Sequence, residues 1–174
     1  MSRLFVAVWP PASVIDALRA WPRPERAGLR WTTEDQWHLT LRFAGDVDAV
    51  GQGALHHALA AVATSAGPVD VTAGPAPRAL GRTVWVLPVK GLESLAGTIG
   101  DATGHVGQPP PDRPFRGHLT LARARRPASL EGLDPTPLTD AWTVREITLV
   151  RSQLRAEGAR YDVIGTWSLR AGCR

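Results

Sequence analysis

Apolar residues fall in short runs along this chain, and most of the runs are bounded by proline, glycine or charged residues. Short apolar runs of this kind are typical of β-strands. We predict strands over residues 4–9, 29–33, 37–45, 69–74, 83–89, 115–123, 141–154 and 160–169. Helical spacing of apolar residues predicts one helix after Pro10 and Pro11, a second over 49–66 and a third over 92–103.

Glycine and proline mark the predicted connections. Gly45 followed by Asp46 predicts a turn at the end of the strand over 37–45. The proline-rich segments 21–28 and 107–114 predict loops. The last two strands are joined by AEGA at 156–159, which predicts a hairpin.

One tetrapeptide, HLTL, occurs twice, at 38–41 and at 118–121. His38 lies 33 residues after Phe5 in the first apolar run, and His118 lies 34 residues after Val84 in a later one. Each half therefore contains a strand, a helix, a loop and a second strand that carries the motif. This order indicates an internal duplication.

The duplication predicts the fold class. We expect an α+β protein in which residues 1–174 form one domain, with repeat units at roughly 3–45 and 82–124. The units would form two pseudo-symmetric lobes, each an antiparallel sheet with helices on the outside. The active-site cleft would lie between the lobes.

Alternation along a strand separates the two kinds of residue in each motif. His38 and Thr40 point to one face, while Leu39 and Leu41 point to the other. The second motif alternates in the same way. If the leucines enter the core of each lobe, two imidazoles and two hydroxyls converge on the cleft.

Two imidazoles can serve as an acid–base pair, because their unperturbed pKa lies near neutrality. A neutral one takes a proton from water, and a charged one gives a proton to the leaving alkoxide. The hydroxyls of Thr40 and Thr120 can donate hydrogen bonds to the nonbridging oxygens of a phosphate. Such a set suits cleavage of a phosphodiester at a ribose, with no metal and no covalent intermediate.

Two other interpretations of the motif stay open on the residues alone. A His-x-Thr sequence on a strand is also compatible with a half-exposed sheet face without catalysis. Paired histidines on two strands can bind zinc, although each motif supplies one ligand and no carboxylate or cysteine lies at ligand spacing beside it. The other three histidines, His56, His57 and His105, are interpreted as bystanders.

The motifs and their flanks resemble the two-histidine phosphoesterases, specifically the LigT-like RNA 2′,3′-cyclic phosphodiesterases, once called 2′-5′ RNA ligases. The resemblance covers nearly the whole chain. The segments that carry it are RLFVAV at the start, WHLTLRFAGDV and FRGHLTLAR at the motifs, and LVRSQLRAEGARYDVIGTWSL at the end.

The resemblance implies hydrolysis of a terminal 2′,3′-cyclic phosphate on RNA to a 2′-phosphomonoester, without a cofactor. It implies that His38 donates the proton to the leaving 3′ oxygen and that His118 activates water. The residue types support an acid–base pair but do not assign the two roles. The competing functions are a 2′-5′ RNA ligase, a hydrolase of small cyclic phosphates, and a non-catalytic RNA- or nucleotide-binding module.

Two arginines and two aromatic residues are candidates for further substrate contacts. Arg42 lies two residues beyond Thr40 and so is expected on the same strand face. Arg123 follows the second motif, and strict alternation places it on the face opposite Thr120 unless the strand bulges. Phe43 and Trp37 can stack on a base, or can pack in the core.

Charge and cysteine content bear on the expected partner and cellular location of the protein. The formal net charge is +4 and nearly all of the positive charge is arginine. Arginine suits phosphate oxygens, which favours an anionic partner, but a GC-rich genome alone is the alternative explanation of this composition. Cys173 is the single cysteine, and no apolar run reaches the ~20 residues of a membrane span. We therefore expect a cytoplasmic monomer that acts on RNA and does not contact a membrane.

Overall fold

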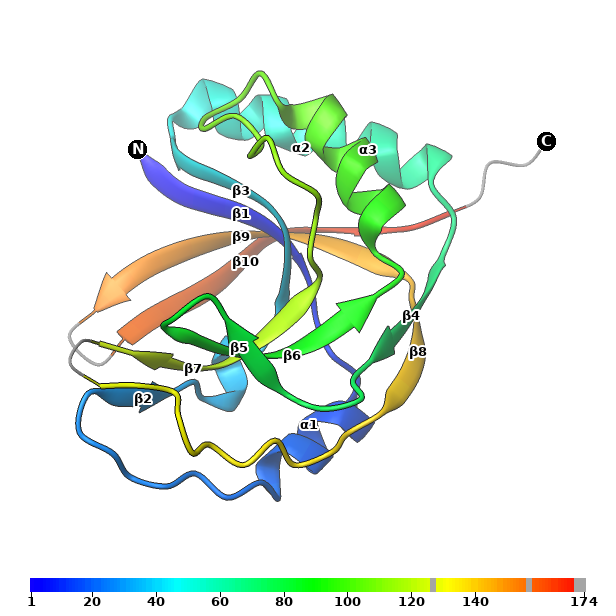
Figure 1. Ribbon diagram of the computed structural model, residues 1–174. Coiled ribbons are helices and arrows are strands. Elements are labelled where there is room, and N and C mark those ends of the chain that lie inside the picture. Colours follow the sequence, from blue (N-terminus) through cyan, green and yellow to red (C-terminus); the bar gives the residue numbers. More distant parts are fainter. Residues whose placement is uncertain (126–127, 156–157, 171–174) are drawn as a thin grey trace.

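Ten strands, three α-helices and one 3₁₀ turn make up the protein in the computed structural model, which describes residues 1–125, 128–155 and 158–170 (Figure 1). The strands are β1 (Ser2–Val8), β2 (Leu29–Trp31), β3 (Leu39–Val47), β4 (Val69–Ala73), β5 (Arg78–Leu80), β6 (Val84–Lys90), β7 (His118–Ala124), β8 (Asp140–Val144), β9 (Glu146–Arg155) and β10 (Gly158–Ser168). The helices are α1 (Ala12–Arg19), α2 (Ala49–Ser65) and α3 (Glu93–Thr103), and the 3₁₀ turn is η1 (Glu34–Gln36).

The strands form one curled antiparallel sheet in the order β10-β9-β1-β3-β7-β6-β4-β8, with β2 beside β7 and β5 beside β6. Strands β3 and β7, which carry the two motifs, meet at the centre of this order through the pair Leu39 and Leu119. On one side, β3 pairs with β1; on the other, β7 pairs with β6. The predicted α+β class, with pseudo-symmetric antiparallel halves, is confirmed.

The helices lie outside the sheet (Figure 1). Helices α2 and α3 contact each other on one side of the molecule, and α1 lies toward the opposite end. Helix α2 begins at an Asp48 cap, whose carboxylate accepts a hydrogen bond from the Gly51 N–H at 2.8 Å. No helix in the described ranges is long and apolar enough to cross a membrane.

Strand β1 is buried on both faces, and this explains its continuous apolar run. Leu4, Val6 and Val8 belong to the main core, together with the motif leucines and the buried faces of the helices. Phe5 and Ala7 belong to a second, smaller apolar cluster. Val150 of β9 belongs to this second cluster, and Phe43 of β3 and Tyr161 of β10 pack against it. The cluster therefore joins the four neighbouring strands β10, β9, β1 and β3.

Most predicted ends differ from the observed ones by one to three residues, and two predictions are wrong in kind. The apolar stretch at 141–154 is two strands: β8 pairs with β4, whereas β9 pairs with β1 and β10 in the other half of the sheet. The charged residues Arg145 and Glu146 lie at the break, but an apolar pattern records burial and not a change of partner, and β9 itself contains Arg151. Gly45 is not in a turn: β3 continues to Val47, and Gly45 has a positive φ of 70° beside a register shift with β1.

The predicted hairpin of the last two strands is confirmed by the antiparallel pairing of β9 with β10. Part of its tip, residues 156–157, lies outside the described residues. Strand β5 and the turn η1 were absent from the predicted elements. Both are only three residues long, too short for a periodic signal.

Candidate active site

Both His-x-Thr motifs face one cavity of about 390 Å³. His38, Thr40, His118 and Thr120 all line it. Their positions follow from the sheet: Leu39 pairs with Leu119 in antiparallel register, and both leucines are fully buried. The alternation of the strands therefore places the imidazoles and hydroxyls together on the other face.

Each imidazole makes the same backbone hydrogen bond. The Nδ1 atom of His38 lies 2.7 Å from the carbonyl oxygen of Gln36, and Nδ1 of His118 lies 2.7 Å from that of Arg116. A carbonyl only accepts, so Nδ1 carries the proton in both rings. Nε2 is then the atom that can accept or release a proton, and Nε2 of His38 lies 3.1 Å from the Thr40 hydroxyl oxygen.

Aromatic rings surround His38. The ring centroids of Phe5, Tyr161 and Trp9 lie 4.8, 4.9 and 5.9 Å from the centroid of its imidazole. Burial lowers the pKa of His38 to about 4, with small contributions in the same direction from Arg123 and His118, while the hydrogen bond to Gln36 opposes the shift. In the free protein His38 is therefore neutral at pH 7.

Burial also lowers the pKa of His118 below 6.5, and the charges of Arg123 and Arg113 act in the same direction. Its hydrogen bond to the Arg116 carbonyl opposes the shift. The preceding residue, Gly117, lets the backbone of β6 come close: a Cβ there would lie 2.4 Å from the carbonyl oxygen of Val89. The glycine before the second motif is thus required by packing.

The expectation that Arg42 shares the face of Thr40 is wrong. Strand β1 places Ala7 opposite Thr40 but Val6 opposite Arg42, so Leu41 is an extra residue in β3 and forms a β-bulge. The bulge reverses the alternation beyond it, and Arg42 is only 4% exposed. Its guanidinium donates to the carbonyls of Phe43, Thr103, Val106 and Gln108, which ties β3 to the segment after α3.

A matching bulge has the opposite result in β7. Strand β6 places Val86 opposite Thr120 but Trp85 opposite Ala122, so the register shifts at Leu121. Arg123 thereby lines the cavity on the same face as Thr120. The sequence predicted Arg123 on the face of Thr120 only if the strand bulged, and the bulge is present.

The aromatic candidates separate in the same way. Trp37 is 2% exposed and packs in the main core, whereas Phe43 lines the cavity with the guanidinium of Arg3 5.0 Å from its ring centroid. Tyr161, Phe5 and Gln36 also line the cavity and were not predicted there. The sequence analysis identified the two motifs and named Phe43 and Arg123 beside them, but nothing local shows which distant strand will lie beside β3.

The remaining histidines lie away from the cavity. His56 packs against Trp167 at a ring-centroid distance of 5.2 Å, and neither His57 nor His105 lines the cavity. Among the described residues, no group of three or more His, Cys, Asp or Glu side chains gathers where a metal ion would fit.

A two-lobed antiparallel sheet with paired His-x-Thr strands facing one cleft defines the class of this protein as a two-histidine protein of α+β fold. The family model described as the 2'-5' RNA ligase superfamily matches residues 6–156. The chain belongs to the 2'-5' RNA ligase superfamily.

Curated relatives cover nearly the full chain. An Escherichia coli protein named RNA 2',3'-cyclic phosphodiesterase is 31% identical, over 96% of this chain and 96% of its own length. A Thermus thermophilus protein of the same name is 32% identical, over 97% of this chain and 90% of its own length.

Solved structures agree. A protein from Thermus thermophilus superposes with a TM-score of 0.82 at 28% identity and 98% coverage of both chains. Escherichia coli LigT in complex with 3'-AMP superposes with a TM-score of 0.81 at 28% identity, over 97% of this chain and 98% of the other.

Proposed function

We propose that this protein is an RNA 2′,3′-cyclic phosphodiesterase, which hydrolyses a terminal cyclic phosphate to a 2′-phosphomonoester. One observation carries the proposal: two imidazoles, each with Nδ1 held by a backbone carbonyl, line one cavity beside two threonine hydroxyls. The names of the full-length relatives support the substrate. Its cytoplasmic location and monomeric state stay predictions from the sequence.

The reaction uses the two Nε2 atoms. Neutral His118 takes a proton from water through Nε2 while the water oxygen attacks phosphorus. The bond from phosphorus to the 3′ oxygen breaks, and charged His38 gives its Nε2 proton to that oxygen. The product keeps the phosphate on the 2′ oxygen, and the two imidazoles have exchanged their protonation states.

The assignment of His38 as the proton donor follows the family resemblance, and it requires that bound substrate change the pKa of His38. Burial keeps His38 neutral in the free protein, which taken alone would suit a base better than an acid. The cyclic phosphate is an anion, and an opposite charge nearby favours the protonated imidazole. Substrate binding must therefore raise the pKa of His38 before the leaving oxygen can receive its proton.

Four further side chains hold the substrate in this proposal. The hydroxyls of Thr40 and Thr120 donate to the nonbridging oxygens, and Arg123 supplies a positive charge to the same phosphate. Phe43 presents an aromatic surface in the cavity on which a base can stack.

The test is an RNA oligonucleotide that ends in a 2′,3′-cyclic phosphate, incubated with the protein in excess EDTA. The wild type is compared with His38→Ala and His118→Ala, and the product isomer is identified. We expect a 2′-phosphate from the wild type and a rate loss on the order of 10²–10⁴ in each variant. Binding without turnover would indicate a binding module instead, and turnover that EDTA abolishes would indicate a metal-dependent reaction.

A second arm separates the related activities that use the same cleft. Cyclic mononucleotides are compared with cyclic-ended oligonucleotides, and RNA ends with a free 5′ hydroxyl are added to detect joining. Preferential turnover of the oligonucleotide without joined products is the expected result.

A further inference from the structure

The turn η1 lies immediately before the first motif and carries Gln36, whose carbonyl fixes the proton on His38. The side chain of Gln36 is itself tied on two sides. Its amide nitrogen donates to the carbonyl of Ala159 in β10 at 2.8 Å, and its amide oxygen accepts from the Thr33 N–H at 3.2 Å. One residue thus holds His38 through its backbone and anchors that backbone through its side chain.

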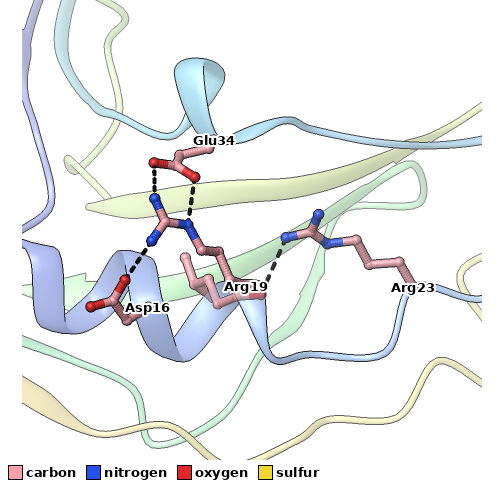
Figure 2. Close-up of polar contacts among 5 residues, drawn as sticks. Asp16, Arg19, Arg23 and Glu34 are labelled. Atoms are coloured by element: carbon pink, nitrogen blue, oxygen red, sulfur yellow. Dashed lines mark hydrogen bonds and ion pairs between the residues drawn. The ribbon is translucent and has the colours of Figure 1, made fainter.

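The far side of η1 is tied to α1. Figure 2 shows Arg19 between Asp16 and Glu34, with Arg19 Nη2 2.5 Å and Nε 2.7 Å from the two carboxylate oxygens of Glu34. Both side chains are about half exposed, so this ion pair contributes little to stability. The half-buried contact of Gln36 with β10 is the tie that lies on the cavity side.

The second motif lacks this arrangement. Arg116 occupies the position equivalent to Gln36, two residues before the histidine, and its carbonyl accepts from His118 in the same way. In the described part of the chain, however, its side chain is exposed and has no hydrogen bond or ion pair. The two histidines have the same first contact but different support behind it.

We propose that Gln36 is a positioning residue, whose side-chain amide locks the carbonyl that keeps the proton of neutral His38 on Nδ1. The proposal rests on the proposed function for its effect on turnover, but not for its effect on the imidazole. Without the hydrogen bond from the Gln36 side chain to Ala159, η1 separates from β10. The hydrogen bond from His38 Nδ1 to the Gln36 carbonyl then weakens, and part of the neutral His38 carries its proton on Nε2 instead. In that form Nε2 points a hydrogen at the substrate and has no lone pair to receive the next proton.

The experiment compares two variants of Gln36 with a matched control. Gln36→Met keeps the approximate length of the side chain and removes both hydrogen bonds. Gln36→Glu keeps the acceptor for Thr33 but presents an oxygen to the Ala159 carbonyl at neutral pH, so it removes the tie to β10. Arg116→Ala truncates the equivalent side chain of the second motif.

The direct readout is the ¹⁵N chemical shift of each imidazole nitrogen in protein labelled at histidine, recorded where the rings are neutral. We expect Nδ1–H for both histidines in the wild type, a mixture at His38 alone in the two Gln36 variants, and no change in Arg116→Ala. On a cyclic mononucleotide, kcat should fall by about 10-fold in Gln36→Met while KM stays within a factor of about two. Arg116→Ala should keep the wild-type kcat.

Two results would overturn the proposal. If both Gln36 variants fold and His38 keeps the wild-type tautomer, the side chain does not position the ring. If KM rises and the tautomer is unchanged, Gln36 contacts substrate instead. Failure of the proposed function looks different, because the wild type would then not turn over a cyclic phosphate while the tautomer measurement still reports on Gln36.

Discussion

Phe43 and Arg123 occupy equivalent positions, each five residues after the histidine of its motif, and both line the same cavity. A bulge within each motif strand turns them toward the cavity. The pseudo-symmetric halves therefore contribute different side chains from the same position of the repeat: an aromatic ring, over which Arg3 lies, and a cation. The two halves of the sheet are therefore similar in backbone but not in the side chains that they bring to the cavity.

The first prediction concerns this cation. Arg123→Ala should lower kcat/KM on a cyclic-ended oligonucleotide by about 100-fold, because one donor to the developing charge on phosphate is lost. Arg123→Lys should recover part of the loss, since lysine keeps the charge but not the two-pronged geometry. Steady-state kinetics test both, and a wild-type kcat/KM in Arg123→Ala would show that phosphate is held elsewhere.

The buried arginine should behave in the opposite way. Arg42→Met leaves the carbonyls of Val106 and Gln108 without their donor, and the free energy of unfolding should fall by about 2–4 kcal/mol. Turnover per folded molecule should change little, because Arg42 does not line the cavity. Urea unfolding and active-site-normalised kinetics separate the two effects, and intact stability with lost activity would contradict the assignment.

Arg42 and Arg123 show which parts of the site could be predicted from the sequence and which could not. The repeated HLTL tetrapeptide and its alternation were sufficient to predict two lobes and the shared face of His38 and His118. Alternation then failed immediately beyond each motif, because a bulge depends on how the strand fits its neighbour rather than on its own residues. Arg42 and Arg123 therefore exchanged the faces that strict alternation assigns to them.

Tyr161, which lines the cavity from β10, could not be predicted for a different reason. Tyr161 is 123 residues from His38 in the chain, and the two meet because β9 leaves β8 at Arg145 and crosses to the opposite half of the sheet. Arg145 and Glu146 interrupt the apolar residues there, but a charged residue also lies inside β9 at Arg151, so the interruption does not by itself mark a new strand. Hydrophobic periodicity specifies which side chains are buried, but not which strand they will accompany.

Tyr161 leads to a prediction about the pKa of His38. Its ring covers one side of His38, and its removal admits water, which stabilises the charged imidazole. Tyr161→Ala should therefore raise the pKa of His38 from about 4 toward 6.5, while Tyr161→Phe should leave it low. An NMR titration of the imidazole Cε1–H resonance measures both values, and the same low pKa in Tyr161→Ala would show that the ring does not keep water out.

The same lowered pKa makes stability depend on pH. The unfolded chain takes up a proton on His38 near pH 6.5, whereas the folded chain does so only near 4, so acidification favours unfolding between these values. The contribution is complete above pH 6.5 and is lost as the pH falls toward 4, by roughly 2–3 kcal/mol. Urea unfolding across this range should show the loss in the wild type and a smaller loss in His38→Asn. Equal losses would assign the effect to other groups.

The pH dependence of turnover follows from both imidazoles. Catalysis needs one neutral and one charged ring, so kcat/KM, which reports on the free enzyme, is largest between the two free-enzyme pKa values. Burial lowers both below 6.5, so we expect a bell with its maximum on the acid side of pH 6.5. The shape is the same whichever histidine is the donor, because only the fraction of protein in the productive protonation state differs.

Bound phosphate should move this bell. Its negative charge favours both charged imidazoles and raises both pKa values, so the maximum of kcat should lie at higher pH than the maximum of kcat/KM. Profiles recorded with one cyclic mononucleotide at saturating and at low concentration give the two maxima. Coincident maxima would mean that the anion does not approach the rings, and a kcat/KM that rises steadily through the alkaline range would exclude a charged imidazole as the proton donor.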